Sequence, residues 1–169
     1  MARLRKKVVA AEVRAPALFV ECEWVVIAID AGIVDRILLA SDTTARAVGE
    51  SGMTLIDTGT GWVPGWDLDA LLGSEAGRGS SWIVVRAPAG WPVPAFALRA
   101  GRCVCVRAMP RSTELPPGVV ELGAGALRAA FATASIPELA AYSTGMVLDP
   151  LRVLTRDQLV RGAEELERA

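Results

Sequence analysis

The stretch that decides the fold reads Met53-Thr54-Leu55-Ile56, then Asp57-Thr58-Gly59-Thr60-Gly61, then Trp62-Val63-Pro64-Gly65-Trp66. Two short apolar runs flank five residues of the types that form turns, which is the pattern of a β-hairpin. The chain continues through Asp67 and Leu68 to Gly73. Asp67 can cap the first turn of a short helix, and Gly73 can end it. The stretch therefore predicts a hairpin that leads directly into a short internal helix.

Similar short runs lie on both sides of this stretch, and turn residues separate them. Before it, residues 18–22 and 24–29 predict a hairpin, residues 33–38 a strand or short helix, and residues 41–52 a loop. After it, we expect a proline-rich interruption at 110–117 and strands at residues 81–85, 91–98, 102–106, 119–122, 127–134 and 146–148. Many short strands separated by turns favour a mainly β protein built from sandwiches or barrels.

The end of the chain has the pattern of a helix. Thr155 and Gln158 have the spacing of a capping box, in which each side chain accepts a hydrogen bond from a backbone N–H of the first turn. Leu159, Val160, Ala163 and Leu166 then form an apolar stripe at helical spacing. We therefore predict a C-terminal helix over residues 155–169 that packs on a barrel.

The glycine-rich residues 74–80 separate an earlier series of predicted strands from a later one. Two series favour two small barrels in one chain of 169 residues. The predicted organisation is an N-terminal extension (1–16), a first barrel (about 17–76), a second barrel (about 77–154) and the C-terminal helix.

Residue content gives catalysis and metal binding little support. The chain has no histidine and three cysteines, Cys22, Cys103 and Cys105. The absence of histidine excludes Ser-His-Asp and Cys-His catalysis and histidine zinc sites. Cys103 and Cys105 lie two apart in a predicted strand, so we expect both to face the core as small apolar groups. We predict no catalytic residue, no metal and no cofactor.

Two pairs of carboxylates could carry acid–base chemistry in principle. Glu21 and Glu23 would share one face of a strand, and Asp67 and Asp69 lie near a helix start. Acid–base catalysis needs two carboxylates in different environments, one of them with a raised pKa. Nothing in the neighbouring sequence predicts such a difference, so a solvated face and a helix cap explain these pairs better.

Charge and hydropathy bound the class of partner. The net charge is −1 and the basic residues after position 7 are scattered, which argues against nucleic acid. The apolar run of residues 18–29 is too short to cross a bilayer and contains Glu21 and Glu23. We expect a cytoplasmic protein without membrane insertion. Its five tryptophans are candidates both for barrel cores and for a protein interface.

The order of motifs resembles the CheW family of chemotaxis adaptors. Its opening hairpin and acid-containing strand are similar to Leu18-Phe19-Val20, Ile27-Ala28-Ile29 and residues 33–38. Its turn, proline-containing strand and Asp-Leu helix are similar to residues 55–73. Later parts resemble Ile83-Val84-Val85, Phe96-Ala97-Leu98, Leu115-Pro116 and the closing residues 145–151. The resemblance covers residues 17–154, and order and spacing carry it.

The resemblance implies two five-stranded SH3-like barrels that share a core. It further implies an adaptor that couples chemoreceptor cytoplasmic tips to the regulatory domain of a CheA-type histidine kinase. The receptor tip would bind an apolar groove between the barrels, with candidate residues Ile33, Val34, Ile37, Leu98 and Val104. The kinase domain would contact the turn formed by Thr58, Gly59, Thr60 and Trp62.

Two positions depart from the family pattern. Thr58 or Gly59 stands where the family has a turn arginine, and Leu98-Arg99 stands where the family has Val-Asp. A divergent adaptor is therefore the first hypothesis. A small β-barrel ligand carrier or enzyme is the alternative, and a self-associating filament component is a third.

Overall fold

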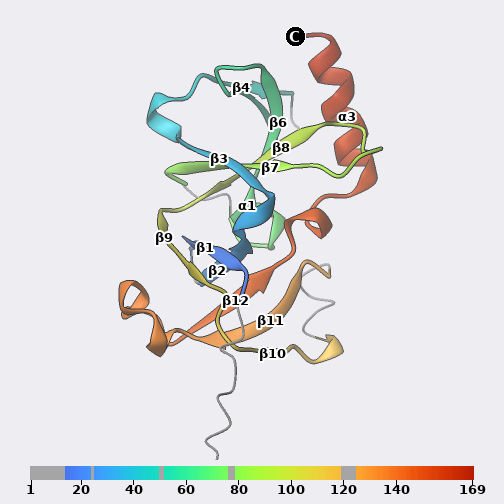
Figure 1. Cartoon of the computed structure of the whole chain (residues 1–169). Coiled ribbons are helices and arrows are strands. Elements are labelled where there is room, and N and C mark those ends of the chain that lie inside the picture. The colour runs from blue at the N-terminus through green and yellow to red at the C-terminus, as the bar shows by residue number, and fades with distance from the viewer. Residues whose placement is uncertain (1–13, 24, 50–51, 76–78, 119–124) are drawn as a thin grey trace, which may run out of the picture.

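The computed structural model describes residues 14–23, 25–49, 52–75, 79–118 and 125–169. Within these ranges the chain forms two six-stranded sheets, one above the other in Figure 1. This confirms the predicted mainly β class with a short internal helix and a C-terminal helix.

The first sheet contains the beginning and the end of the strand-forming chain. Its strands are β1 (Pro16–Glu21), β2 (Val26–Asp30), β9 (Cys103–Ala108), β10 (Ser112–Glu114), β11 (Leu127–Ala132) and β12 (Thr144–Leu148). They lie in the order β10-β11-β12-β2-β1-β9, with β12 and β2 parallel and the other pairs antiparallel.

The second sheet contains the middle of the chain. Its strands are β3 (Val34–Leu39), β4 (Ala45–Val48), β5 (Met53–Asp57), β6 (Trp62–Asp67), β7 (Ser81–Arg86) and β8 (Ala95–Ala100). They lie in the order β3-β7-β8-β6-β5-β4, and only β6 and β8 of the described strands in this sheet pair in parallel.

The helical elements are short apart from the last one. They are α1 (Leu68–Leu71), α3 (Arg156–Glu167) and the 3₁₀ turns η1 (Ala31–Ile33), η2 (Ala40–Asp42), η3 (Thr133–Ser135), η4 (Pro137–Leu139) and η5 (Pro150–Arg152). Both predicted caps form: Asp67 accepts from Ala70 N at 3.1 Å, and Thr155 and Gln158 make the reciprocal capping box.

Chain connections force both sheets to curl. A flat six-stranded sheet would separate its edge strands by about 24 Å, since neighbouring strands lie about 4.8 Å apart. The edges of the first sheet, β9 and β10, are joined by residues 109–111 alone, which span at most about 14 Å. The edges of the second sheet, β3 and β4, are joined by residues 40–44, three of them in η2. Each sheet must therefore bend into a barrel.

The predicted division at residue 77 needs correction. Residue 77 falls between β6 and β7, which both belong to the second sheet. The first sheet instead combines residues 16–30 with residues 103–148. The hairpin of β1 and β2 is paired as predicted, but its other partners β9 and β12 come from far along the chain. Local sequence patterns do not specify such distant pairings.

Three smaller expectations also changed. Residues 45–48 form β4 instead of continuing a loop, and residues 112–114 form β10 inside the proline-rich stretch. The strand predicted at 91–98 begins at Ala95, after the last proline of that segment. A strand predicted at 119–122 lies outside the described residues.

One apolar layer lies between the two barrels and joins them. Sheet one contributes Leu18, Val20, Ile27 and Ile29, and sheet two contributes Ile83, Val85, Phe96 and Leu98, together with further buried residues. Each barrel also encloses a smaller cluster of its own, around Phe19 and Phe131 in the first and around Trp82 and Val84 in the second. Successive residues of one strand therefore alternate between the shared layer and the inner cluster of their own barrel.

Helix α3 packs on the second barrel through Leu159, Ala163 and Leu166 of the predicted stripe (Figure 1), whereas Val160 is exposed. Gly162 of this helix is buried against β6. A Cβ atom at this position would lie 2.9 Å from the ring of Pro64 and 3.2 Å from the ring of Trp66. The helix therefore depends on glycine here for its contact with the barrel.

A bulky residue at position 162 should loosen this contact. We expect Gly162→Val to lower the free energy of unfolding by about 2 kcal/mol, because neither ring can move aside without disturbing the sheet. Chemical denaturation followed by tryptophan fluorescence measures the change. Arg161→Val, at an exposed neighbouring position, is the matched control and should lose only the small helix-propensity difference. Equal losses in the two variants would contradict the packing argument.

Candidate protein-binding surfaces

Edge strand β3 carries exposed apolar side chains on the face that looks toward the first sheet. Ile37 pairs with Ile83, a member of the shared layer, so the two side chains lie on the same face of the sheet. Leu39 follows two residues later on that face. Ile37 is 41% exposed and Leu39 57% exposed. The shared apolar layer therefore continues to the molecular surface along β3.

Strand β9 of the first sheet also presents apolar side chains toward the opposite sheet. A bulge in β9 determines which of its residues lie on that face. Val20 pairs with Cys103 and Phe19 with Cys105, which leaves Val104 as an extra residue. Val104 and Cys105 pack against the inner cluster of the first barrel, whereas Cys103 packs against the shared layer. The prediction that both cysteines share a face is therefore wrong, and Val104 does not face the second sheet.

Val106 completes the face of β9 that looks toward the second sheet. It pairs with Leu18, a member of the shared layer, and is 52% exposed. The bulge is why Val106, and not Cys105, lies on the same face of β9 as Cys103.

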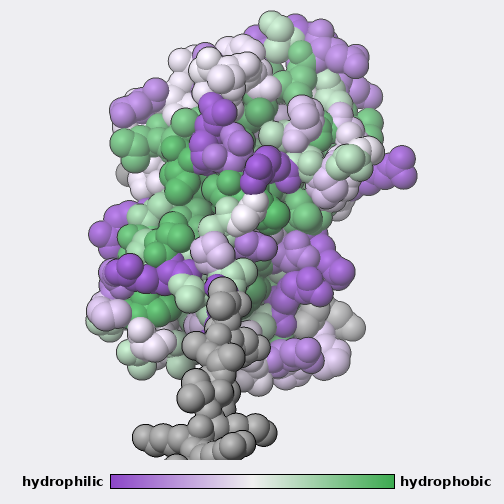
Figure 2. Space-filling model, viewed as in Figure 1, coloured by the Kyte–Doolittle hydropathy of each residue, from purple (hydrophilic) through white to green (hydrophobic). Residues whose placement is uncertain are grey.

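The exposed rows of β3 and β9 approach each other at Cys103. The Cys103 side chain lies near Ser81, the strand partner of Leu39. Burial raises the pKa of the Cys103 thiol, so it stays protonated at neutral pH and behaves as an apolar group. We call Ile37, Leu39, Cys103 and Val106 the apolar strip. Figure 2 shows hydrophobic residues gathered over this side of the molecule, between hydrophilic areas.

The other residues predicted for the groove have different positions. Ile33 and Val34 are half-buried and pack against the shared layer at the start of β3. Leu98 is fully buried on β8, between β6 and β7, so its prediction as a contact residue is corrected. Leu98 supports the layer from inside because β8 is a central strand, which the sequence pattern did not reveal.

The predicted kinase-facing residues do form one turn, between β5 and β6. Thr58 N and Thr58 Oγ1 both donate to Gly61 O, at 3.0 and 2.8 Å, and Gly59 N donates to Asp57 Oδ1 at 2.8 Å. Gly59 has φ +79°, a conformation that side-chain-bearing residues rarely adopt. Thr60 lies at the exposed tip of the same turn.

Two arginines from other strands reach this turn, and the sequence pattern identified neither of them. Arg36 of β3 donates from Nη1 to Thr58 O at 3.1 Å. Arg46 of β4 lies with its guanidinium carbon 6.0 Å from the ring centre of Trp62, a cation–π arrangement. Trp62 is 37% exposed. We call the turn residues 58–62 with Arg36 and Arg46 the turn cluster.

The second departure from the family pattern, Arg99, has a local role. Its Nε donates to Gly79 O at 2.9 Å, and its guanidinium lies 5.7 Å from the ring centre of Trp82. These contacts hold Arg99 against the second barrel. The turn carries no arginine of its own, but Arg36 and Arg46 reach it from β3 and β4.

The paired carboxylates are engaged in structural contacts. Glu21 forms an ion pair with Arg102 at 2.9 Å, and Asp69 accepts a hydrogen bond from Glu23 N at 3.1 Å. Burial, followed by the nearby charge of Asp69, raises the pKa of Cys22. No group of three or more His, Cys, Asp or Glu residues gathers in the described ranges in a way that could hold a metal ion.

Two curled sheets that share one apolar layer define the CheW-like fold. The structure is similar to the crystal structure of the scaffolding protein TtCheW from Thermoanaerobacter tengcongensis, with a TM-score of 0.65. The match covers 83% of this chain and 92% of that chain at 14% sequence identity, so the likeness is one of fold. No family model and no curated protein matches the sequence. None of the described helices has the length and apolar composition to cross a membrane.

The bond from Arg36 should hold the turn in its observed shape. We expect Arg36→Met to raise the amide hydrogen-exchange rates of Thr58 to Gly61 by about fivefold, because one hydrogen bond contributes about 1 kcal/mol. Arg46→Met is the matched control, because it removes the contact with Trp62 but leaves the bond to Thr58 O. Unchanged exchange in Arg36→Met would show that the turn's own hydrogen bonds suffice.

Proposed function

We propose that this protein is a non-enzymatic cytoplasmic adaptor of a chemotaxis-like signalling system. It would couple the cytoplasmic tip of a chemoreceptor to the regulatory domain of a CheA-type histidine kinase or a divergent equivalent. The fold it shares with the scaffolding protein TtCheW supports this role. The observation that carries the proposal is that the described residues present two separate surface features, the apolar strip and the turn cluster.

The apolar strip suits a helical partner. Two edge strands offer branched aliphatic side chains and one thiol, with exposures between about two fifths and three fifths at Ile37, Leu39 and Val106. Receptor tips are helical in the CheW-type systems that the sequence resembles, and an amphipathic helix can lay one apolar face on such a surface. Because the strip continues the shared layer, its side chains are held in place before a partner arrives.

The turn cluster suits an acidic partner surface. Trp62 offers a large, partly exposed ring, and Arg46 brings positive charge beside it, while Arg36 pairs with Asp35 at 2.8 Å and donates to the turn. Tryptophan and arginine are the residues most enriched among strong contacts in protein interfaces. We propose that the kinase regulatory domain binds here, through acidic side chains that face Arg46 and an apolar group that packs on Trp62.

Charge in the apolar strip should weaken receptor binding without unfolding the protein. We expect Ile37→Glu to weaken binding of a helical receptor-tip peptide about tenfold or more, since a desolvated carboxylate would face the apolar helix. Titration by fluorescence anisotropy measures the affinity.

The matched control for this experiment is Val160→Glu, which places the same charge at a similarly exposed apolar residue on α3. Both variants should keep the melting temperature, because neither residue is buried. Wild-type affinity in a folded Ile37→Glu variant would remove the strip from the receptor site.

The arrangement of arginines predicts a selective kinase interaction. We expect weak binding to a conventional CheA-type regulatory domain, since Thr58 and Gly59 cannot offer the bidentate contact of the family's turn arginine. A CheW-like kinase domain from the same genome should bind more tightly, and Arg46→Gln should weaken that complex about tenfold.

Isothermal titration against both domains tests this expectation, with Arg161→Gln on α3 as the charge-matched control. Tight binding to the conventional domain, unchanged by Thr58→Arg, would show that the departure at the turn has no functional effect. Equal losses in Arg46→Gln and Arg161→Gln would assign the effect to overall charge.

A further inference from the structure

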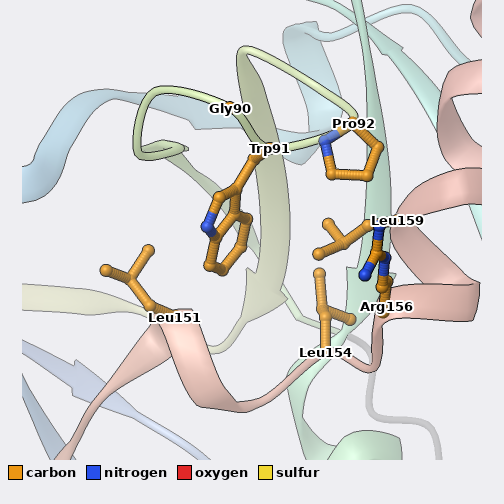
Figure 3. A pocket seen from close by; sticks show the side chains of 7 residues that line it. All are labelled: Gly90, Trp91, Pro92, Leu151, Leu154, Arg156 and Leu159. Carbon is orange, nitrogen blue, oxygen red and sulfur yellow. The ribbon is translucent and has the colours of Figure 1, made fainter.

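A cavity of about 440 Å³ lies away from both contact surfaces. It opens between the loop that joins β7 to β8 and the segment that leads from η5 into α3. Figure 3 shows the residues that line it, which are Gly90, Trp91, Pro92, Leu151, Leu154, Arg156 and Leu159. The volume lies in the range of about 300–1,000 Å³ that is usual for small-molecule sites.

The apolar walls of this cavity are held in place by the core. Trp91 stacks on the buried ring of Phe96, with ring centres 6.3 Å apart and planes inclined by 12°. Leu154 and Leu159 are buried members of the shared layer. In Figure 3 the Trp91 ring lies between Leu151 on one side and Leu154 with Leu159 on the other. An apolar ligand would therefore enter a preformed site and would not have to order its walls.

One charged group faces this apolar surface. Arg156, the first residue of α3, extends its side chain beside Pro92 at the wall of the cavity (Figure 3). The described residues show no ion pair for Arg156, whereas its neighbour along the chain, Arg152, pairs with Asp149 at 3.4 Å. The lining residues otherwise carry no side-chain charge. The cavity surface is thus part apolar, from Trp91 and the leucines, and part polar, with exposed Arg156 as its one charged side chain.

We infer that this cavity binds a small amphipathic carboxylate, with its apolar part against Trp91 and the leucines and its carboxylate on Arg156. An apolar site with one precisely placed charged group is the usual composition of a ligand pocket. Guanidinium is also the side-chain group best matched to a carboxylate, because it can donate two parallel hydrogen bonds. This site is independent of the proposed adaptor role, since none of its lining residues belongs to the strip or the turn cluster.

A pair of probes that share a phenylalkyl chain but end in a carboxylate or in a neutral hydroxyl tests the inference on the full chain. Isothermal titration and the NMR signal of the Trp91 indole N–H would follow 4-phenylbutyrate and the uncharged 4-phenylbutanol. We expect the acid to bind about tenfold more tightly than the alcohol, because hydrogen bonds to charged groups are the stronger class. Arg156→Gln should remove this preference, and Arg161→Gln on the same helix should leave it intact.

A variant that fills the cavity separates binding there from binding elsewhere. Leu151→Trp should abolish binding of both probes while the melting temperature stays near that of the wild type, since Leu151 is only half-buried. Unchanged binding in folded Leu151→Trp, equal affinities of the two probes, or no binding at millimolar concentration would each overturn the inference. A Trp91 signal that shifts with protein concentration alone would assign the cavity to a second copy of the chain and overturn it as well.

Discussion

The shared apolar layer between the two barrels is the interaction on which the remaining structure depends. Each barrel by itself encloses only a small cluster, around Phe19 in one and Trp82 in the other. The layer adds fully buried Ile, Leu and Phe side chains from both sheets, and each such side chain contributes about 1.5–3 kcal/mol. Helix α3 and the cavity beside it also rest on this layer through Leu154 and Leu159. The two barrels, the apolar strip and the cavity therefore all depend on packing against the same apolar layer.

The same layer explains why an exposed apolar surface can exist without disorder. On the edge strands β3 and β9, the apolar residues of this face are no longer covered by the opposite sheet. Ile37 and Val106 are therefore exposed, although their strand partners Ile83 and Leu18 are buried. On the other face of β3, Arg36 reaches the turn cluster. A single edge strand consequently connects the two surfaces that we assign to different partners.

Local signals in the sequence predicted the local structure well. The hairpin of β1 and β2, the cap at Asp67 and the capping box at Thr155 each depend on residues close together in the chain. Strand β4 was missed because its first three residues are small or charged and exposed, and its pairing with β5 supplies the missing stability. Strand partition between the sheets was wrong because it depends on contacts between distant residues.

The site residues follow the same rule. The turn at residues 58–62 is a local feature, and the structure forms it as predicted. Leu98 and Val104 were assigned wrongly because a central strand position and a β-bulge are set by neighbouring strands. Leu39 could have been found, since it follows Ile37 at strand spacing. Arg36 and Arg46 could not, because only the folded sheet brings them to the turn.

The order of the strands along the chain has a consequence for synthesis on the ribosome. Every strand of the second barrel lies between residues 34 and 100, whereas the first barrel also needs residues 103–148. A chain made from its N-terminus can therefore finish the second barrel while the β1–β2 hairpin still lacks its outer partners. The apolar face of that barrel, with Ile83 and Phe96, is then available to cover the waiting hairpin. The second barrel would then fold first, and the first barrel would be completed against its apolar face.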